Sequence, residues 1–326
     1  MKHLFIGGTG NISADCTREA LRVGHEVWHL NRGNRNAIPG VRTIQVDATD
    51  EQAVAAALGN ESFDTVTDFI AFSSSDIDRD IRLYQNRTRQ FVFISSASAY
   101  HKPVRHFQIT ESTPLHNPFW DYSRQKIACE ERLLAEYRRS GFPVTIVRPS
   151  HTYSDGWLPS SFGSRDFTVA ERILSGKPII VHGDGRSLWT LTHTEDFARA
   201  FVPLLGNPRA TGEAYHVTSD DVLDWDAIHT TIASQLGREA NIVHIPSDFI
   251  AKVAPSRGGG LLGDKAHSVV FDNTKIKSLV PGWVARIPFH EGVTRSLAWY
   301  EAHPEEKIAN PELEQEIEHI LSAWNR

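Results

Sequence analysis

The chain has 326 residues, a hydrophobic content of 40% and a formal net charge of −6 at pH 7. This length and composition predict one large domain, or two interlocked ones, with a substantial buried core. The charges are mixed, without long blocks of one sign, which argues against a nucleic acid or an anionic membrane as a partner. We therefore expect a small-molecule substrate.

The two cysteines, Cys16 and Cys129, are too few and too far apart to indicate a disulfide framework or a zinc site. No set of His, Asp or Glu residues has the spacing of metal ligands, so we predict no metal. The chain begins with a strand-like run that lacks the features of a signal peptide, and no stretch reaches about 18 apolar residues. These features favour a cytoplasmic protein.

The first half of the chain alternates short apolar runs with amphipathic segments, which is typical of a parallel sheet with crossover helices. The predicted strands are, in chain order, 3–7, 26–30, 42–46, 65–69, 90–94 and 144–147. The clearest helices are predicted over 14–23 and 123–139. Together these segments predict an α/β fold.

After Pro149 the alternation weakens, and we expect this half to carry the substrate surface. The run PSRGGGLLGDK, residues 255–265, is predicted to be a loop and is a candidate lid. A terminal helix that caps its own domain is predicted from apolar residues at helical spacing: Leu313, Ile317, Ile320, Leu321 and Trp324.

The segment THTEDFA contains several polar residues that begin a predicted helix. Thr194, Glu195 and Asp196 are interpreted as its cap and the acids of its first turn. His193 faces either the cleft or the core, and the sequence does not decide between them.

The first predicted strand ends in a glycine-rich turn, GGTGNIS, before a helix. Glycine lets the backbone approach a pyrophosphate, whose charge the helix N-terminus favours. Ser13 stands where a third glycine usually allows close packing of helix and strand, and we interpret it as a local packing difference. The turn residues predicted to contact a dinucleotide are Gly7, Gly8, Thr9, Gly10, Asn11 and Ile12.

The ends of the next two strands bear on which dinucleotide is bound. Asn31 stands where an acid would bind the ribose hydroxyls of NAD, and Arg32 can pair with a 2′-phosphate, which favours NADP over NAD. Asp47, followed by Ala48, either accepts a hydrogen bond from the adenine amino group or caps a helix.

The segment WDYSRQK places Tyr122 and Lys126 on one face of a predicted helix, because they are four residues apart. Ser95 and Ser96 end the preceding strand, at the sheet edge where α/β proteins bind ligands. A nearby ammonium and an oxidised nicotinamide both favour a phenolate. Tyr122 would then exchange a proton with a substrate hydroxyl while Ser96 holds the oxygen.

Taken as a set, these motifs resemble the extended short-chain dehydrogenases/reductases, the NAD(P)-dependent epimerase/dehydratase group. The resemblance runs from Lys2 to about Tyr300 and rests on GGTGNIS, VDATD, FISSASAY, YSRQK, VRPSHTY, GDGRSLWTLTHTEDFA and FDNTKIKSLVPGW. It implies Ser96, Tyr122 and Lys126 as the catalytic residues. Ala71, Ser95, Tyr122, Lys126 and Pro149 are expected beside the cofactor.

The resemblance also implies an architecture. We expect a Rossmann-type doubly wound parallel sheet over residues 1–155 and a smaller C-terminal substrate-binding domain over 156–326. Segments near 178–205 are expected to return to the sheet. A homodimer is implied as well.

Several positions depart from the family pattern. Ala97 and Ser98 replace the Asp-Glu pair of 4,6-dehydratases, which disfavours dehydration. Trp189 replaces an arginine that clamps a nucleotide diphosphate, although an indole can stack on a sugar. His151 replaces an asparagine and is predicted to hydrogen-bond a substrate hydroxyl. These changes predict a sugar, glycoside or polyol substrate without a nucleotide diphosphate.

Three functions remain open at this point. The catalytic set serves net oxidation or reduction of a secondary alcohol and also epimerisation through a transient ketone. A nucleotide-sugar 4-epimerase is the alternative substrate class. Some relatives are RNA-binding or cofactor-sensing regulators, including the chloroplast stem-loop-binding proteins, but the acidic chain and the Tyr122/Lys126 pair argue against that function.

Overall fold

The computed structural model describes residues 1–106, 108–162 and 165–326. Within these residues a seven-stranded sheet has the order β12-β7-β5-β4-β1-β2-β3, and all neighbouring strands are parallel. Its strands are β1 (Lys2–Ile6), β2 (Glu26–Asn31), β3 (Arg42–Gln45), β4 (Phe63–Asp68), β5 (Thr88–Ile94), β7 (Val144–Pro149) and β12 (Ala214–Val217). The chain winds outward in both directions from β1, so the predicted Rossmann-type doubly wound fold is confirmed.

All six predicted strands are present, with small shifts at their ends. Strand β1 lies inside the sheet, and Leu4, Phe5 and Ile6 are buried on alternating faces. The near-continuous apolar run at the start of the chain therefore reflects a parallel strand that is covered on both sides.

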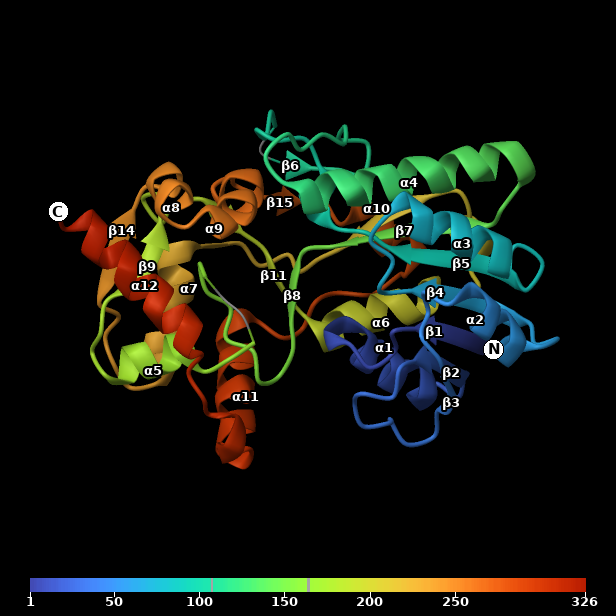
Figure 1. Ribbon diagram of the computed structural model, residues 1–326, viewed down its shortest axis with the longest axis horizontal. Coiled ribbons are helices and arrows are strands. Elements are labelled where there is room, and N and C mark those ends of the chain that lie inside the picture. Colours follow the sequence, from blue (N-terminus) through green and yellow to red (C-terminus); the bar gives the residue numbers. More distant parts are fainter. Residues whose placement is uncertain (107, 163–164) are drawn as a thin grey trace.

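Helices cover both faces of this sheet (Figure 1). Helices α1 (Asn11–Arg22) and α6 (Thr194–Leu204) cover one face, where Phe5, Phe197 and Phe201 share one cluster. The opposite face is covered by α2 (Glu51–Leu58), α3 (Ser74–Tyr84) and α4 (Asp121–Ser140). The two layers of helices leave the carboxyl ends of the strands open for a ligand.

Residues 178–205 divide between the two parts of the molecule. Strand β9 (Ile179–His182) pairs with β14 (Ile242–Ile245) in the C-terminal part, whereas α6 packs against α1. Strand β12, which follows this range, joins the edge of the main sheet beside β7.

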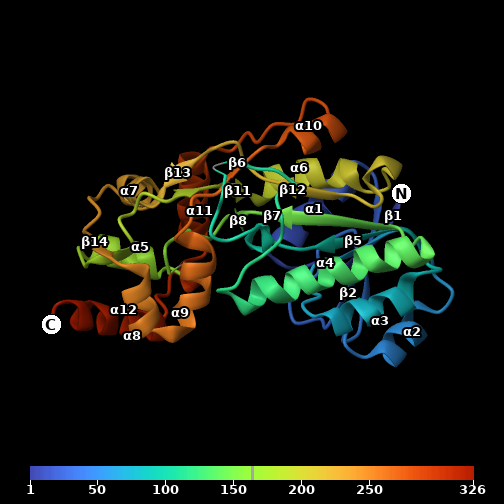
Figure 2. The same cartoon turned by 90° about the horizontal axis from the view of Figure 1, so that it is seen from above.

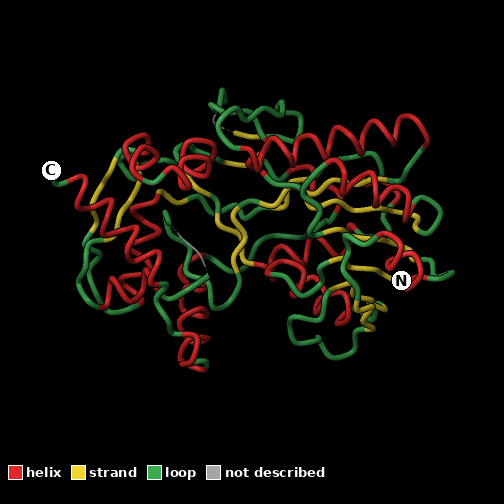
Figure 3. Tube along the Cα trace, viewed as in Figure 1, coloured by secondary structure: helices red, strands yellow, loops and turns green. Residues whose placement is uncertain are grey.

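Most of the remaining elements form the C-terminal part, which lies at one end of the long axis in both views, whereas α10 (Thr274–Leu279) packs beside β12 of the main sheet (Figures 1 and 2). Strands β8 (His151–Tyr153) and β11 (Leu191–His193) pair in parallel between this part and the main sheet (Figure 3). The other strands are β6 (Gln108–Ile109), β10 (Leu188–Trp189), β13 (Leu223–Asp224) and β15 (Val270–Phe271). The other helices are α5 (Thr168–Leu174), α7 (Trp225–Gln235), α8 (Ser247–Val253), α9 (Pro255–Gly260), α10 (Thr274–Leu279), α11 (Phe289–Ala302) and α12 (Pro311–Trp324).

The run 255–265 is helical, so the prediction of a loop is wrong. Helix α9 continues into a short π-helical turn over Leu261–Lys265. The glycines let this segment approach Trp120 closely, because a Cβ at Gly263 would lie 2.7 Å from the Trp120 Cβ. Glycine serves close packing here rather than a turn, and composition alone does not separate these two uses.

The predicted terminal helix is confirmed as α12. Leu313, Ile317, Ile320 and Leu321 are buried in a cluster with residues of β14 and α8. Trp324 is 40% exposed but contacts the Phe249 ring edge-on, with 5.0 Å between ring centroids. The helix therefore packs against its own part of the molecule. In the described ranges, no helix has the length and apolar character needed to cross a membrane.

Candidate active site

A cavity of about 490 Å³ lies where the carboxyl ends of β1, β5 and β7 meet the C-terminal part. The predicted site residues that line it are Gly7, Gly10, Asn11, Ile12, Ser95, Ser96, Tyr122, Lys126, Pro149, His151 and Trp189. The predicted site residues that do not line it are Gly8, Thr9, Asn31, Arg32, Asp47, Ala48 and Ala71. The glycine turn, the catalytic candidates and the substrate candidates therefore share one cavity.

The glycine turn is closed by the Ser13 hydroxyl. Ser13 Oγ donates to Gly7 O and accepts from Gly10 N, both at 2.7 Å. Gly7 has a φ of +78°, in the left-handed region that favours glycine. Ser13 is buried and closes the turn with two hydrogen bonds. Its role therefore goes beyond the local packing difference that we predicted. A serine in the first turn of a helix is a recognised capping signal, which could have indicated this role.

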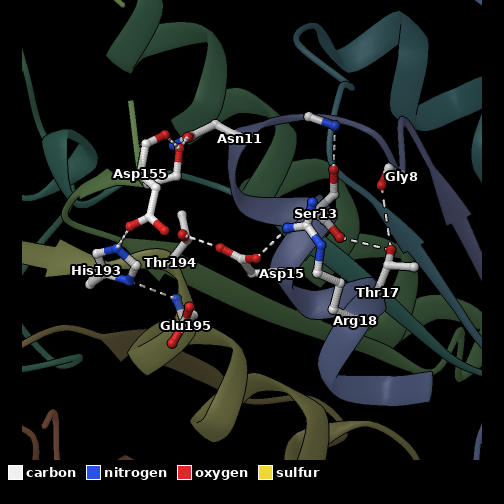
Figure 4. A network of polar contacts seen from close by, with 12 residues as sticks. Gly8, Asn11, Ser13, Asp15, Thr17, Arg18, Asp155, His193, Thr194 and Glu195 are labelled. Atoms are coloured by element: carbon white, nitrogen blue, oxygen red, sulfur yellow. Dashed lines mark hydrogen bonds and ion pairs between the residues drawn. The ribbon is translucent and has the colours of Figure 1, made fainter. Parts of the chain in front are cut away.

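Gly8 faces the core. A Cβ on Gly8 would lie 2.3 Å from His29 Cδ2, so the residue provides space for the imidazole. Its carbonyl oxygen accepts from Thr17 Oγ1 at 3.4 Å (Figure 4). The middle glycine therefore serves the packing of α1 on β2.

The start of α1 fits a pyrophosphate. The first backbone hydrogen bond of α1 runs from Ala14 N to Gly10 O at 3.1 Å. The backbone N–H groups of Asn11 and Ile12 precede it, and both residues line the cavity. Such free N–H groups and the positive end of the helix dipole attract phosphate oxygens. The residues present thus fit the dinucleotide that the turn predicts.

The predicted adenosine-side residues lie at the ends of β2 and β3. Asn31 Oδ1 accepts from Gly33 N at 2.9 Å. Asp47 Oδ1 accepts from both N and Oγ1 of Thr49, which lowers the pKa of the Asp47 carboxyl. Asp50, and not Asp47, caps α2. The exposed Arg32 side chain makes no hydrogen bond or ion pair with the described residues.

The Tyr122 ring lies between two other aromatic rings. Its centroid is 5.6 Å from that of Phe72 and 4.8 Å from that of Trp120. Burial raises the pKa of the Tyr122 phenol, and interaction with the Ser96 side chain opposes part of this rise. The direction differs from the one we expected from a nearby ammonium, because removal from water raises the pKa most and the negative charge of Asp264 adds to this rise.

Lys126 is buried and is held by the backbone. Its Nζ donates to Ala71 O at 2.8 Å and to Ile94 O at 2.9 Å, and it lies 6.0 Å from the Tyr122 ring centroid. Burial lowers the pKa of the ammonium. These contacts fix Lys126 at the carboxyl end of β5. Ala71, predicted at the cofactor site, contributes a carbonyl that orients the lysine.

Three serine hydroxyls form a chain that ends at Ser96. Ser123 Oγ donates to Ser98 Oγ at 2.8 Å, and Ser98 Oγ lies 2.9 Å from Ser96 Oγ. Ser96 Oγ also accepts from Ser98 N at 3.2 Å. Because Ser98 has one proton and accepts from Ser123, it donates to Ser96, and the Ser96 proton is left for a ligand or Tyr122. Sequence reasoning missed Ser123 and this use of Ser98.

The Ser95 side chain turns away from the cavity. Ser95 Oγ donates to Glu130 Oε1 at 2.5 Å, and Glu130 forms a buried ion pair with Arg148 at 2.5 Å. Arg148 also donates to the Tyr100 hydroxyl at 3.1 Å. Only the backbone of Ser95 is therefore left to face the cavity.

The substrate candidates His151 and Trp189 contact each other. Trp189 Nε1 donates to His151 Nδ1 at 3.2 Å. The Trp189 ring is only 3% exposed and packs against Trp225. Burial lowers the pKa of His151 to about 3, so the imidazole is neutral and carries its proton on Nε2.

Two charged residues of the cavity were missed by sequence reasoning. Asp264 and Lys265 line it, and both belong to the run predicted to be a loop. Asp264 Oδ1 pairs with the Nζ of the fully buried Lys102 at 3.6 Å. Burial raises the pKa of Asp264 and lowers that of Lys102.

A polar network connects the glycine turn to the C-terminal part (Figure 4). Asn11 Nδ2 donates to Thr152 O at 2.9 Å, and Ser154 Oγ donates to Asn11 Oδ1 at 2.5 Å. His193 Nε2 donates to Asp155 Oδ1 at 3.1 Å, and His193 Nδ1 accepts from Glu195 N. His193 is therefore a buried helix cap.

Thr194 is the first residue of α6 and not its cap, because His193 caps the helix, whereas Glu195 and Asp196 lie in the first turn as interpreted. Thr194 donates to the Asp15 carboxylate. Asp196 accepts from Arg286 N at 2.9 Å and from Ile287 N at 2.8 Å. Among the described residues, no group of three or more His, Cys, Asp and Glu side chains could hold a metal ion.

The chain is similar to known proteins over most of its length. A model of the NAD dependent epimerase/dehydratase family matches residues 4–218. The 2′-dehydrokanamycin reductase of Streptomyces kanamyceticus is 27% identical over 254 residues, 77% of this chain and 71% of the reductase. The 41 kDa chloroplast stem-loop binding protein b of Arabidopsis thaliana is 26% identical over 267 residues, 76% and 67% of the two chains.

The solved dTDP-glucose 4,6-dehydratase of Bacillus anthracis, in complex with NAD, has the same fold. It superposes with a TM-score of 0.75 at 18% identity, over 94% of this chain and 98% of the dehydratase.

Proposed function

Because the chain belongs to the NAD-dependent epimerase/dehydratase family, we propose that it oxidises or reduces a secondary hydroxyl or ketone of a sugar-like substrate, as net redox or within an epimerisation. It is an NAD-dependent enzyme of the class that includes sugar dehydratases, epimerases and reductases. The predicted family is thereby confirmed.

One observation carries this proposal: Ser96, Tyr122 and Lys126 line the same cavity as the glycine turn. The Ser96 hydroxyl, aligned by Ser98, donates to the substrate oxygen. The protonated Tyr122 phenol gives its proton to that oxygen during reduction and takes it back during oxidation. Lys126 orients the ribose side of the cofactor and stabilises negative charge on Tyr122. The bound dinucleotide supplies or accepts the hydride.

We propose NADP as the preferred dinucleotide. The exposed Arg32 is free to pair with a 2′-phosphate, and Asn31 places no negative charge against that phosphate. Fluorescence titrations with both oxidised dinucleotides test this preference. Tighter binding of NADP supports it, and equal or tighter binding of NAD contradicts it.

We propose that the substrate carries no nucleotide diphosphate. Trp189 occupies the position of the clamping arginine, and its ring is buried against Trp225 and His151. An indole N–H engaged by His151 offers nothing to a diphosphate. Calorimetric titration with UDP-sugars tests the proposal, and ordinary affinity for them would favour a nucleotide-sugar 4-epimerase. The homodimer stays a prediction.

The substitution Tyr122→Phe tests the catalytic assignment. Turnover should fall by at least about 100-fold because the proton donor is lost, while dinucleotide binding should be retained. A panel of sugars and secondary alcohols, followed by the absorbance of reduced cofactor and by product configuration, measures turnover and separates net redox from epimerisation.

Tyr137→Phe is the matched control, because Tyr137 is an exposed tyrosine of the same helix α4. Its turnover should equal that of the unaltered protein. Unchanged turnover in Tyr122→Phe would remove Tyr122 from the mechanism.

A further inference from the structure

Building on the proposed function, we propose that Lys265 and His151 form a subsite for an anionic group of the substrate, either a carboxylate or a phosphate monoester. Both residues line the cavity. The subsite narrows the substrate class to an acidic or phosphorylated sugar derivative.

The position of Lys265 is fixed by its backbone. The Lys265 carbonyl oxygen accepts from His182 Nε2 at 2.9 Å and from Ser187 Oγ at 2.8 Å. Lys265 is the last residue of the π-helical turn that follows α9. The side chains of His182 in β9 and of Ser187 in the next loop therefore hold the end of this turn. A lysine held in this way loses little further backbone freedom when it binds a ligand.

The Lys265 ammonium has no partner within the part of the chain that the structure describes. It makes no hydrogen bond or ion pair there, although the residue is partly buried. Its neighbour Asp264 is already paired with the fully buried Lys102 at 3.6 Å. The nearby Arg257 is paired with Glu316 at 2.5 Å. After these pairs are counted, Lys265 is the unmatched charge of this cavity wall.

His151 adds a second donor at the same place. Its Nδ1 accepts from Trp189 Nε1, so the neutral ring carries its proton on Nε2. Within the described residues Nε2 has no acceptor. The positive charge of Lys265 acts on His151 and, together with burial, disfavours protonation of the ring. Two donors without an acceptor therefore face one end of the cavity.

Burial lowers the pKa of Lys265, and an anion from outside the protein would stabilise its ammonium form in this partly buried wall. Lysine offers a point charge and not the flat bidentate fork that arginine presents to a diphosphate. The subsite therefore suits a compact anion, which agrees with the loss of the arginine at Trp189. It disfavours a polycationic aminosugar, because Lys265 would repel it.

Calorimetric titration of the full-length protein, saturated with oxidised dinucleotide, tests the proposal with matched pairs of ligands. The carboxylate arm compares D-gluconate with D-glucitol. The phosphate arm compares D-glucose 6-phosphate with D-glucose, and D-glucosamine serves as the cationic probe. The two arms distinguish the two sources of negative charge.

We expect the anion of at least one arm to bind about 10- to 100-fold more tightly than its neutral counterpart. Lys265→Gln should abolish this preference and leave the affinity for the neutral ligand unchanged. Lys265→Arg should retain most of the preference, which shows that the fold tolerates substitution. Lys252→Gln is the matched control, because Lys252 is exposed on α8 and does not line the cavity.

The proposal is wrong if neither anion binds more tightly than its neutral counterpart, if glucosamine is preferred, or if Lys265→Gln keeps the preference. These outcomes are independent of turnover. Tyr122→Phe should retain the preference for the anion, so a failure of the catalytic assignment is distinguishable from a failure of the subsite.

Discussion

The Ser13 hydroxyl links the two ends of the glycine turn. Ser13 bridges the two ends of the turn by bonding Gly7 O and Gly10 N. A third glycine would offer space but no hydrogen bond at this position. The two Ser13 hydrogen bonds form a polar clasp across the turn, and Gly7 has the left-handed φ of +78°.

Ser13→Ala removes both hydrogen bonds of this clasp. We expect a loss of about 1–3 kcal/mol in the free energy of unfolding, because two part-buried hydrogen bonds of about 0.5–1.5 kcal/mol each are lost. Dinucleotide affinity should fall as well, since the turn loses its fixed shape. Urea unfolding and fluorescence titration measure the two effects.

Ser278→Ala is the control, because Ser278 Oγ also donates to a backbone carbonyl, Thr274 O at 2.8 Å, but on an exposed surface. It should leave both quantities nearly unchanged. Equal results for the two variants would show that the Ser13 clasp contributes neither to the free energy of unfolding nor to dinucleotide affinity.

Spacing along the chain predicted some of the site residues but not others. Tyr122 and Lys126 are four positions apart on one helix, and such local patterns are visible in a sequence. Asp264 and Lys265 reach the same cavity from a distant segment. Both residues follow a run of glycines that is typical of a loop. The sequence there has no periodicity that could have indicated a helix facing the cavity. Contacts between distant segments depend on tertiary packing, which local patterns do not encode.

At the scale of the element, the segment formed by α9 and the following π-helical turn acts as a rigid wall beside Tyr122. Gly263 packs against Trp120, and Trp120 contacts the Tyr122 ring. Asn117 Nδ2 donates to Gly263 O at 2.7 Å, which fixes the same contact from the other side. The position of the Tyr122 phenol, the proposed proton donor, therefore depends on a glycine in another segment.

Gly263→Ala should disturb this wall. The new Cβ would lie 2.7 Å from Trp120 Cβ and 3.0 Å from Asn117 Oδ1, so the segments must separate. We expect a loss of about 1–3 kcal/mol in stability, as for overpacking, and a lower kcat/KM. Urea unfolding and steady-state kinetics measure these changes.

Gly260→Ala is the matched control in α9. The nearest atoms to its Cβ would lie at 3.9 Å, which is an ordinary contact. Alanine also favours the helix by up to about 1 kcal/mol, so stability should stay equal or rise. A Gly263→Ala variant that behaves like this control would contradict the rigid-wall interpretation.

At the scale of the whole molecule, buried neutral histidines make stability depend on pH. Burial lowers the pKa of His29, His182 and His229 to about 4. In the unfolded chain histidine ionises near pH 6.5, so below that pH the unfolded state binds protons that the folded state does not. The stability is therefore fully present above about pH 6.5 and is lost as the pH falls toward 4.

His229→Gln should reduce this pH dependence. His229 Nδ1 donates to Trp225 O at 2.7 Å and Nε2 accepts from Ser161 N at 3.3 Å, and a glutamine amide offers both functions without titrating. Between pH 7 and pH 5 the variant should lose about 2 kcal/mol less stability than the unaltered protein. Urea unfolding at the two pH values measures the difference.

His319→Gln is the control, because His319 is exposed on α12. It should lose as much stability as the unaltered protein over the same pH interval. If His229→Gln behaves in the same way, His229 does not contribute to the acid sensitivity.

The sequence patterns located the main sheet well and the C-terminal part poorly. Near-continuous burial marks β1, β4, β5 and β7, since each lies between two layers of helices, whereas the edge strand β3 is mostly exposed. The short strands β10, β13 and β15 have only two residues each, too few for any periodicity. Trp189 is an example. Its position in a family motif could be recognised in the sequence, but its burial against Trp225 could not, because it depends on the pairing of β10 with β13 and on the placement of α7.

The side chain of Asn11 joins the two halves of the molecule. Its backbone N–H lies at the N-terminus of α1, and its side-chain amide bonds Thr152 O and Ser154 Oγ at the entry to the C-terminal part. We therefore expect the binding of a dinucleotide and of a substrate to be coupled through this residue. This coupling is reciprocal: the factor by which the dinucleotide changes the affinity for the substrate equals the factor by which the substrate changes the affinity for the dinucleotide.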